Sequence, residues 1–115
     1  MKAFLKSFTY ALNGIVVSFR DQRNLKVQAF IALMIIGAGF YFSITATEWC
    51  LIVLSIALVM GMEMINTAIE NLVDLVTKEH KPLAGKVKDV VAGAVLFASL
   101  MAVVTGIIIF LKYLV

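Results

Sequence analysis

The spacing of hydrophobic and polar side chains divides the chain into four helical segments. In residues 1–23, large apolar side chains recur every three or four positions, and polar side chains occupy the opposite face. This pattern predicts an amphipathic helix that lies on a membrane surface. Two later stretches, residues 27–47 and 90–111, are almost free of charge and long enough to cross a bilayer as helices. We therefore predict transmembrane helices over residues 25–45 and 84–113.

The segment between these two helices is apolar in its first half and amphipathic in its second. Residues 49–62 form a fourteen-residue apolar run, and the pattern continues to residue 76 without a proline. We predict one transmembrane helix over residues 47–76. Its thirty residues make roughly 45 Å of helix against a hydrocarbon core of about 30 Å, so one end should emerge into the headgroup region. The expected fold is a single all-α domain, with an interfacial helix followed by three transmembrane helices.

Composition and charge favour this membrane assignment. Hydrophobic residues make up 63% of the chain and charged residues only 15%, which is outside the range of soluble domains of this size. Five of the ten basic residues precede residue 27, and four more lie in the second connection. By the positive-inside rule, the N-terminus and the second connection are expected to be cytoplasmic, and the C-terminus outside. The net charge of +3 therefore reflects topology rather than nucleic-acid binding. Cys50 is the only cysteine, which excludes an internal disulfide.

Four polar residues interrupt the apolar pattern of the second transmembrane helix. Glu63, Asn66, Glu70 and Asp74 are separated by three, four and four residues. On a helix this spacing places them on one face within about 80° of one another. We call these four residues the polar seam. A carboxylate inside a bilayer costs roughly 2.5 to 3.5 kcal/mol at mid-span and less near the ends, so three on one face suggest a function.

The residues alone leave several uses of the seam open. The acids could simply face water at a helix end, or they could bind cations or move protons. One carboxylate could bind Mg²⁺ together with substrate phosphates while another acts as a base. Lys88 and Asp89, at the start of the third transmembrane helix, are expected on the same side of the membrane and could meet a phosphate. Lys88 could equally be a topological anchor. The chain has no Walker A motif and no glycine-rich kinase loop.

The seam also carries a resemblance to a known family. Residues 63–74 match the pattern E-x-x-N-[ST]-A-x-E-x-x-x-D, and residues 85–89 follow as Gly-Lys-Val-Lys-Asp. This combination resembles the small integral-membrane diacylglycerol kinases of bacteria and their close relatives, the undecaprenol kinases. The resemblance implies a homotrimer in the bacterial inner membrane that transfers the γ-phosphate of ATP, with Mg²⁺, to a lipid hydroxyl at the cytoplasmic interface.

The resemblance also implies roles for individual residues. Glu63 would be the general base, Asn66 would orient the reacting groups, and Lys88 would meet the phosphates. Glu70 would bind the metal ion, with Gln22 at the position where the family usually has a second glutamate. A neutral glutamine oxygen should hold Mg²⁺ less strongly than a carboxylate, and Asp21 is a possible substitute. The residues expected to contact the nucleotide are Tyr10, Asp74, Glu79, His80, Lys81, Lys88 and Asp89.

Three functions remain open at this point. The leading one is phosphorylation of diacylglycerol to phosphatidic acid, and the alternative within the family is phosphorylation of undecaprenol to undecaprenyl phosphate. Both acceptors present a hydroxyl, and the difference must lie in how their tails pack against residues such as Ala29, Leu33 or Val59. Outside the family, a small proton-coupled transporter is the rival, although such proteins usually have four spans with the acid near mid-bilayer. A purely structural membrane protein would leave the seam without a role.

Overall fold

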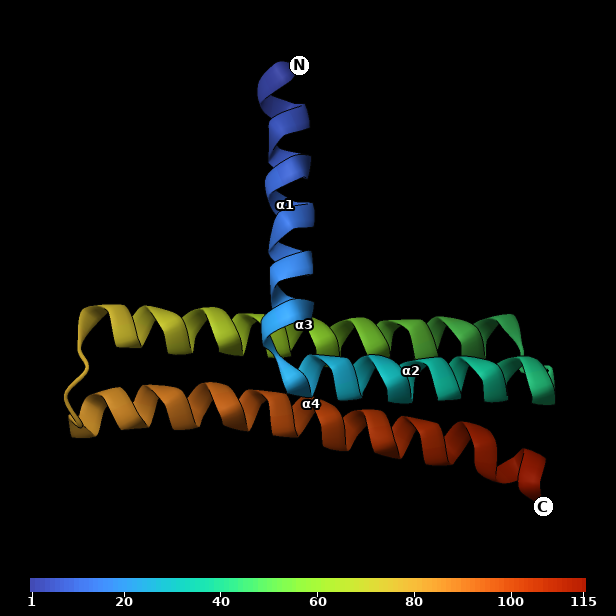
Figure 1. Ribbon diagram of the computed structural model, residues 1–115. Helices are drawn as coiled ribbons and strands as arrows, with labels where there is room; N and C mark the ends of the chain where they lie inside the picture. Colours follow the sequence, from blue (N-terminus) through green and yellow to red (C-terminus); the bar gives the residue numbers. More distant parts are fainter.

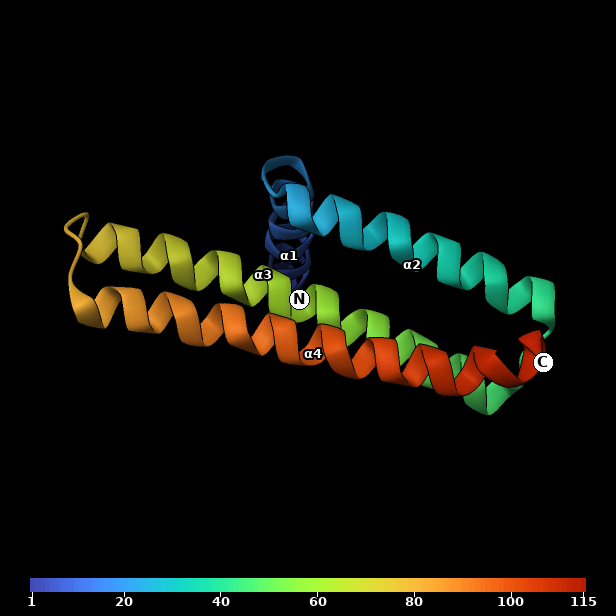
Figure 2. The same cartoon turned by 90° about the horizontal axis from the view of Figure 1, so that it is seen from below.

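The computed structural model describes residues 1–115 as four α-helices without any strand (Figure 1). Helix α1 covers Lys2–Asp21, α2 Arg23–Phe42, α3 Ala46–Val76 and α4 Pro82–Leu114. Helices α2, α3 and α4 lie side by side in both views (Figures 1 and 2), and α1 projects away from the bundle in Figure 1 and is seen nearly end-on in Figure 2. Three helices are long and apolar enough to cross a membrane, namely α2, α3 and α4. The predicted all-α fold with three spanning helices is therefore confirmed.

The three bundle helices differ in length, and this difference positions the polar seam. Helix α2 has 20 residues, whereas α3 has 31 and α4 has 33. At 1.5 Å per residue these are roughly 30, 46 and 50 Å long. The C-terminal part of α3 and the N-terminal part of α4 accordingly extend past the joint between α1 and α2 (Figure 1). We call this the Asp74 end of the bundle and the opposite end the Glu48 end.

Helix boundaries at the Glu48 end follow from local capping. Helix α2 ends at Phe42, three residues before the expected boundary, because Ser43 adopts a left-handed conformation with φ of 50°. Thr45 then caps α3: its hydroxyl accepts the Glu48 N–H at 3.2 Å, and the Glu48 carboxylate accepts the Thr45 N–H at 2.9 Å. This reciprocal capping box satisfies two backbone donors that a helix start would otherwise leave free.

Helix α4 begins at Pro82, two residues earlier than expected. The sequence placed Pro82 in the connecting loop, but the structure places it in the first turn of the helix. Proline is favoured there because its ring presets a helical φ and its missing N–H would have no partner in that turn. The connection between α3 and α4 is consequently only residues 77–81.

Helix α1 is amphipathic and packs little against the rest of the chain. None of its residues is buried, and its apolar side chains are exposed. Only Gln22, in an extended conformation, separates it from α2, so α1 ends two residues before the predicted residue 23 and α2 begins two residues before the predicted residue 25. Beside this joint, Arg20 donates to Asp21 at 3.0 Å, and this hydrogen bond raises the pKa of the Arg20 guanidinium. A free apolar face at the rim of the bundle is consistent with a helix on a membrane surface.

Helices α3 and α4 form the main packing interface of the bundle. Val91, Ala98 and Ile109 of α4 are buried, at intervals of seven and eleven residues. This spacing keeps them on one helix face, and the small side chain of Ala98 allows close approach of the two helices. Ile109 joins Ile44 and Ile52 in an apolar cluster at the Glu48 end. Most other large apolar side chains are exposed, as expected for helices that face lipid.

Candidate functional site

Glu63 lies inside the bundle, at the depth where α2 begins. Lys88 of α4 pairs with Asp74 of α3, and the two helices are antiparallel. Glu63 is eleven residues before Asp74 and Ser99 is eleven residues after Lys88, so Ser99 is level with Glu63. Gly39 of α2 lies against Trp49 of α3. Leu25 is fourteen residues before Gly39 and Glu63 is fourteen residues after Trp49, so Leu25 is level with Glu63. Leu25 is fully buried and Glu63 is only 3% exposed. The Glu63 carboxylate therefore sits at the rim of the apolar bundle rather than in solvent.

The Glu63 carboxylate makes no ion pair or hydrogen bond with another side chain. The only side-chain hydrogen bond to Glu63 is made to its backbone: the Thr67 hydroxyl donates to the Glu63 carbonyl at 3.1 Å. Glu63 as a whole residue is only 3% exposed, but the fully buried side-chain oxygens without a partner belong to Gln28 and Asn66, so the Glu63 carboxylate remains accessible. Such a group has both oxygens available for the hydroxyl of a substrate. This arrangement is suited to a general base.

Asn66 and Glu70 form the next part of the polar seam. The Asn66 amide donates to the Glu70 carboxylate at 2.7 Å, across one turn of α3. Asn66 is 8% exposed, and its side-chain oxygen is buried without a hydrogen-bond partner. An unpaired amide oxygen beside a carboxylate offers two oxygen ligands of the type that Mg²⁺ prefers. The chain has no cluster of three or more His, Cys, Asp or Glu side chains that could hold a metal alone. A half-site completed by substrate phosphates is therefore what these residues fit.

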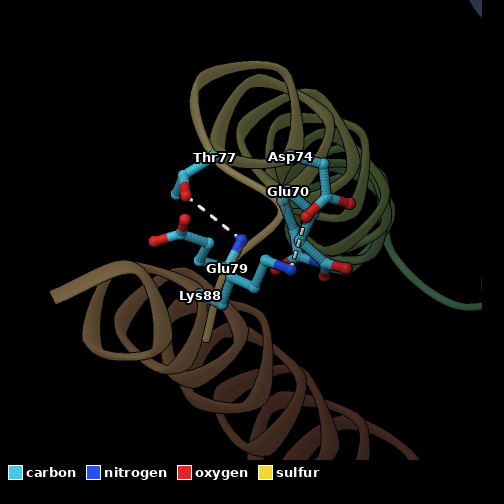
Figure 3. Close-up of polar contacts among 6 residues, drawn as sticks. Glu70, Asp74, Thr77, Glu79 and Lys88 are labelled. Carbon is cyan, nitrogen blue, oxygen red and sulfur yellow. Dashed lines mark hydrogen bonds and ion pairs between the residues drawn. The ribbon is translucent and has the colours of Figure 1, made fainter. Parts of the chain in front are cut away.

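Asp74 and Lys88 join the seam to α4. The Lys88 ammonium donates to the Asp74 carboxylate at 2.7 Å, and Glu70 lies on the same side of α3 (Figure 3). The two side chains are 39% and 57% exposed, respectively. An exposed ion pair contributes little to stability and can open for a competing anion. A phosphate could thus replace the Asp74 carboxylate on Lys88 without loss of a buried contact.

The connection between α3 and α4 forms a polar cavity beside this ion pair. The cavity has a volume of about 360 Å³ and includes Asp74, Lys88 and residues 77–82 in its lining. Within the loop, the Glu79 N–H donates to the Thr77 hydroxyl at 3.1 Å (Figure 3). Lys81 lies 4.0 Å from Glu79. The predicted nucleotide residues Glu79, His80 and Lys81 therefore meet Asp74 and Lys88 around one cavity.

Three predicted site residues lie outside this assembly. Tyr10 is 70% exposed on α1, which projects away from the bundle (Figure 1). Asp89 is exposed on α4 and is not among the residues that line the polar cavity. Gln22 is half-buried at the joint between α1 and α2. The structure thus brings the seam, Lys88 and the loop together, but not these three.

A second, apolar groove lies between α2, α3 and α4 and was not predicted from the sequence. Its volume is about 510 Å³, and 13 of its 17 lining residues are hydrophobic. It extends along α4 from Ser99, which is level with Glu63, to Leu114 at the Glu48 end. Gln28 lies near the end of the groove that is level with Glu63, and the Gln28 amide oxygen is buried without a hydrogen-bond partner. The available signal for Gln28 was an amide side chain near the start of the uncharged stretch of residues 27–47.

Comparison with known proteins identifies relatives over nearly the whole chain. The profile of prokaryotic diacylglycerol kinase matches residues 9–110. An undecaprenol kinase from Bacillus subtilis (strain 168) is 39% identical over 114 residues, which cover 99% of this chain and 93% of the relative. A diacylglycerol kinase from Haemophilus influenzae is 31% identical over 107 residues, covering 92% of this chain and 91% of the relative. A diacylglycerol kinase from Synechocystis is 39% identical over 103 residues, covering 89% of this chain but only 59% of that longer protein.

Proposed function

The chain belongs to the prokaryotic diacylglycerol kinase family and is an ATP-dependent lipid kinase, and from this premise we propose how its residues divide the reaction. The proposed reaction transfers the γ-phosphate of ATP to the hydroxyl of diacylglycerol, with undecaprenol as the alternative acceptor. The observation that carries the assignment is the unpaired carboxylate of Glu63, a buried residue at the rim of the bundle and on the same helix face as Glu70 and Asp74.

Glu63 acts as the general base in this proposal. It takes the proton of the lipid hydroxyl as the hydroxyl oxygen attacks the γ-phosphorus, and the bond between the γ-phosphorus and the β-phosphate oxygen breaks to release ADP. Phosphoryl transfer depends mainly on positioning and on neutralising charge, so it needs few protein groups. Glu63, on α3, is level with the start of α2. This position supports the role, because we expect the hydroxyl of a membrane lipid at that depth.

Asn66 and Glu70 are proposed to hold the Mg²⁺ that accompanies ATP. The short hydrogen bond between them fixes the Glu70 carboxylate, and the unpaired Asn66 oxygen points to a missing partner. Gln22 is the proposed second protein ligand from the joint between α1 and α2, with a neutral oxygen in place of a carboxylate. When bound, the ion would neutralise charge on the transferred phosphate.

Lys88 is proposed to exchange Asp74 for phosphate when ATP binds. Lysine supplies a compact positive charge for the phosphate oxygens, and Asp74 is then free to contact the nucleotide. The polar cavity formed with Glu79, His80 and Lys81 supports nucleotide binding on this side of the bundle. Tyr10 and Asp89 would join the nucleotide only if α1 and the start of α4 approach the cavity upon binding, and their roles therefore stay predictions.

The apolar groove is proposed to receive the hydrocarbon tail of the acceptor. It begins level with Glu63 and runs along α4 toward the Glu48 end, so a tail in it would place its hydroxyl near the base. Val59 lines the groove, whereas Ala29 and Leu33 do not. Diacylglycerol and undecaprenol differ in tail length and in the polar atoms next to the hydroxyl, and the names of the relatives include both kinds of kinase.

Assembly and orientation complete the proposal. The chain is proposed to form a homotrimer in the bacterial inner membrane, with the Asp74 end in the cytoplasm. The distribution of basic residues supports this orientation. The many large apolar side chains exposed on the bundle leave ample surface for both lipid and neighbouring subunits.

The decisive experiment measures labelled phosphate in lipid. Purified protein in vesicles receives γ-labelled ATP and Mg²⁺ with diacylglycerol or undecaprenol in parallel. Glu63→Gln should remove at least 99% of the activity, because general base catalysis typically contributes 10²–10⁴-fold. Asn71→Ala, at an exposed polar position on the same helix, is the matched control and should retain activity. Wild-type activity in the Glu63→Gln variant would refute the assignment of the base, and no labelling of either lipid by wild type would refute both proposed acceptors.

A further inference from the structure

A second polar cluster lies at the Glu48 end, far from the polar seam. Glu48 is 7% exposed, although its carboxylate is at the end of an apolar helix. It accepts the Tyr113 hydroxyl and forms an ion pair with Lys112, both from the last turns of α4. We call Glu48, Lys112 and Tyr113 the end clamp. The ring of Tyr113 also packs on Phe42, with ring centroids 5.9 Å apart.

The end clamp and the Asp74–Lys88 pair are the only side-chain polar contacts between α3 and α4. Glu48 and Asp74 are 26 residues apart on α3, and Lys88 and Lys112 are 24 residues apart on α4. Both spans correspond to nearly 40 Å of helix. The two contacts therefore specify the same antiparallel alignment of α3 and α4.

Between these contacts, the buried side chains of α4 are small or apolar, and no side-chain hydrogen bond or ion pair joins α3 to α4. Ala98 and Val91 are the buried residues of α4 near the seam. In a bilayer, apolar helix faces gain nothing from avoiding lipid, and small side chains allow neighbouring helices close approach along a smooth surface. Such an interface favours contact but specifies the axial position weakly. The five-residue connection limits how far α4 can shift along α3, and within that limit polar contacts determine the axial position.

Only the end clamp can keep this alignment during the proposed reaction. The Asp74–Lys88 pair is exposed to solvent and has to open when Lys88 meets a phosphate. Glu48, in contrast, is buried and also accepts the Thr45 N–H at 2.9 Å, so its carboxylate is fixed to the start of α3. Its bonds to Tyr113 and Lys112 fix the end of α4 to the same point.

We propose that Glu48, Lys112 and Tyr113 are positioning residues that set the axial register of α4 on α3 and thereby place Lys88 beside Glu70 and Asp74. The effect on ATP rests on the proposed function of Lys88, whereas the effect on register does not. The end clamp touches no substrate, and it acts through the length of α4.

The kinetic test compares variants that remove single contacts of the end clamp. Tyr113→Phe removes only the hydroxyl, and Lys112→Met removes the ion pair. Hydrogen bonds between membrane helices have modest strength, so each variant should raise the KM for ATP roughly three- to tenfold. The KM for the lipid should rise as well, because α4 also lines the apolar groove proposed for the acceptor tail. Lys112→Arg, which keeps the ion pair, should restore the wild-type KM.

Two control variants separate positioning from stability. Tyr41→Phe removes a hydroxyl from an 82% exposed tyrosine near the same end of the bundle and should leave both KM values unchanged. Thr45→Ala removes the cap bond to the Glu48 N–H but leaves the end clamp in place. It should lower the melting temperature without raising the KM for ATP.

A distance measurement tests the register without any activity. Spin labels are attached to cysteines at exposed Leu75 of α3 and exposed Val104 of α4, which are well separated along the helix axes, in a Cys50→Ser background and diluted with unlabelled protein. A slip of one helical turn would change the distance by about 5 Å. Tyr113→Phe and Lys112→Met should shift or broaden the distance distribution, and Tyr41→Phe should not. An unchanged distribution in both variants, even with a lowered melting temperature, would overturn the proposal, whether or not the wild type phosphorylates lipid.

Discussion

Replacement of Asn66 by aspartate tests the part of the polar seam assigned to Mg²⁺. The Asn66 amide donates to the Glu70 carboxylate at 2.7 Å, and the variant would place a second carboxylate at this position. The lost hydrogen bond costs about 1 kcal/mol. Two like charges about 4 Å apart repel by about 4 kcal/mol at an effective dielectric constant of 20, which solvent near the helix end reduces to about 1–2 kcal/mol.

We therefore expect Asn66→Asp to lower the free energy of unfolding by about 2–3 kcal/mol in EDTA. Excess Mg²⁺ should recover most of this loss, because the ion would neutralise both carboxylates. Unfolding in mixed micelles with increasing denaturing detergent, with and without MgCl₂, measures both effects. Asn71→Asp, five residues further along α3, is the exposed control and should change stability by less than about 0.5 kcal/mol.

Two results would refute this reasoning. If Asn66→Asp destabilised the protein no more than Asn71→Asp, the contact with Glu70 would not govern the local energetics. If the variant lost stability but Mg²⁺ recovered none of it, the pair would not be a metal half-site. Because the readout is unfolding, neither result depends on lipid kinase activity.

Two further pairs of substitutions test the nucleotide end and the packing of the bundle. Lys88→Met should raise the KM for ATP by at least tenfold in the labelled-phosphate assay, whereas Lys86→Met, at an exposed position of α4 without a partner in the seam, should change it less than twofold. Equal effects would show that Lys88 acts only as a topological anchor. Gly39→Ala should lower stability by about 1–3 kcal/mol, because its new Cβ would lie 2.6 Å from the Trp49 ring. Gly37→Ala meets nothing within 4 Å and should be neutral or slightly stabilising, and an equal loss in both variants would contradict the close contact.

Periodicity and charge predicted the architecture because membrane helices follow from few physical rules. Long uncharged stretches located the three spans, and the three- and four-residue spacing of the seam placed Glu63, Asn66 and Glu70 on one face. Local capping moved the boundaries. Ser43 ends α2 by a left-handed conformation, which the identity of the residue does not predict because serine rarely adopts it. Pro82 starts α4, although proline is as common in loops as in the first turn of a helix.

Contacts between helices could not be predicted because a single sequence does not determine how helices are shifted along one another. The pair between Asp74 and Lys88 depends on the alignment of α3 with α4, and so does the end clamp around Glu48. The sequence alone assigned no role to Glu48, which lies at the start of the predicted helix over residues 47–76. Tyr10 shows the opposite case, since the family pattern suggested a site position but the structure leaves its side chain in solvent on α1.

The 20 residues of α2 have a consequence for where this protein can work. Its length of roughly 30 Å equals the average hydrocarbon thickness, and the chain changes direction into α1 where α2 begins. The shortest spanning helix therefore matches one particular bilayer thickness. In a thicker membrane, α2 would become more upright or draw α1 inward, and in a thinner one the whole bundle would tilt. Either change would alter the depth of Glu63, the proposed base, and we therefore expect turnover to depend on lipid chain length even when the acceptor itself is unchanged.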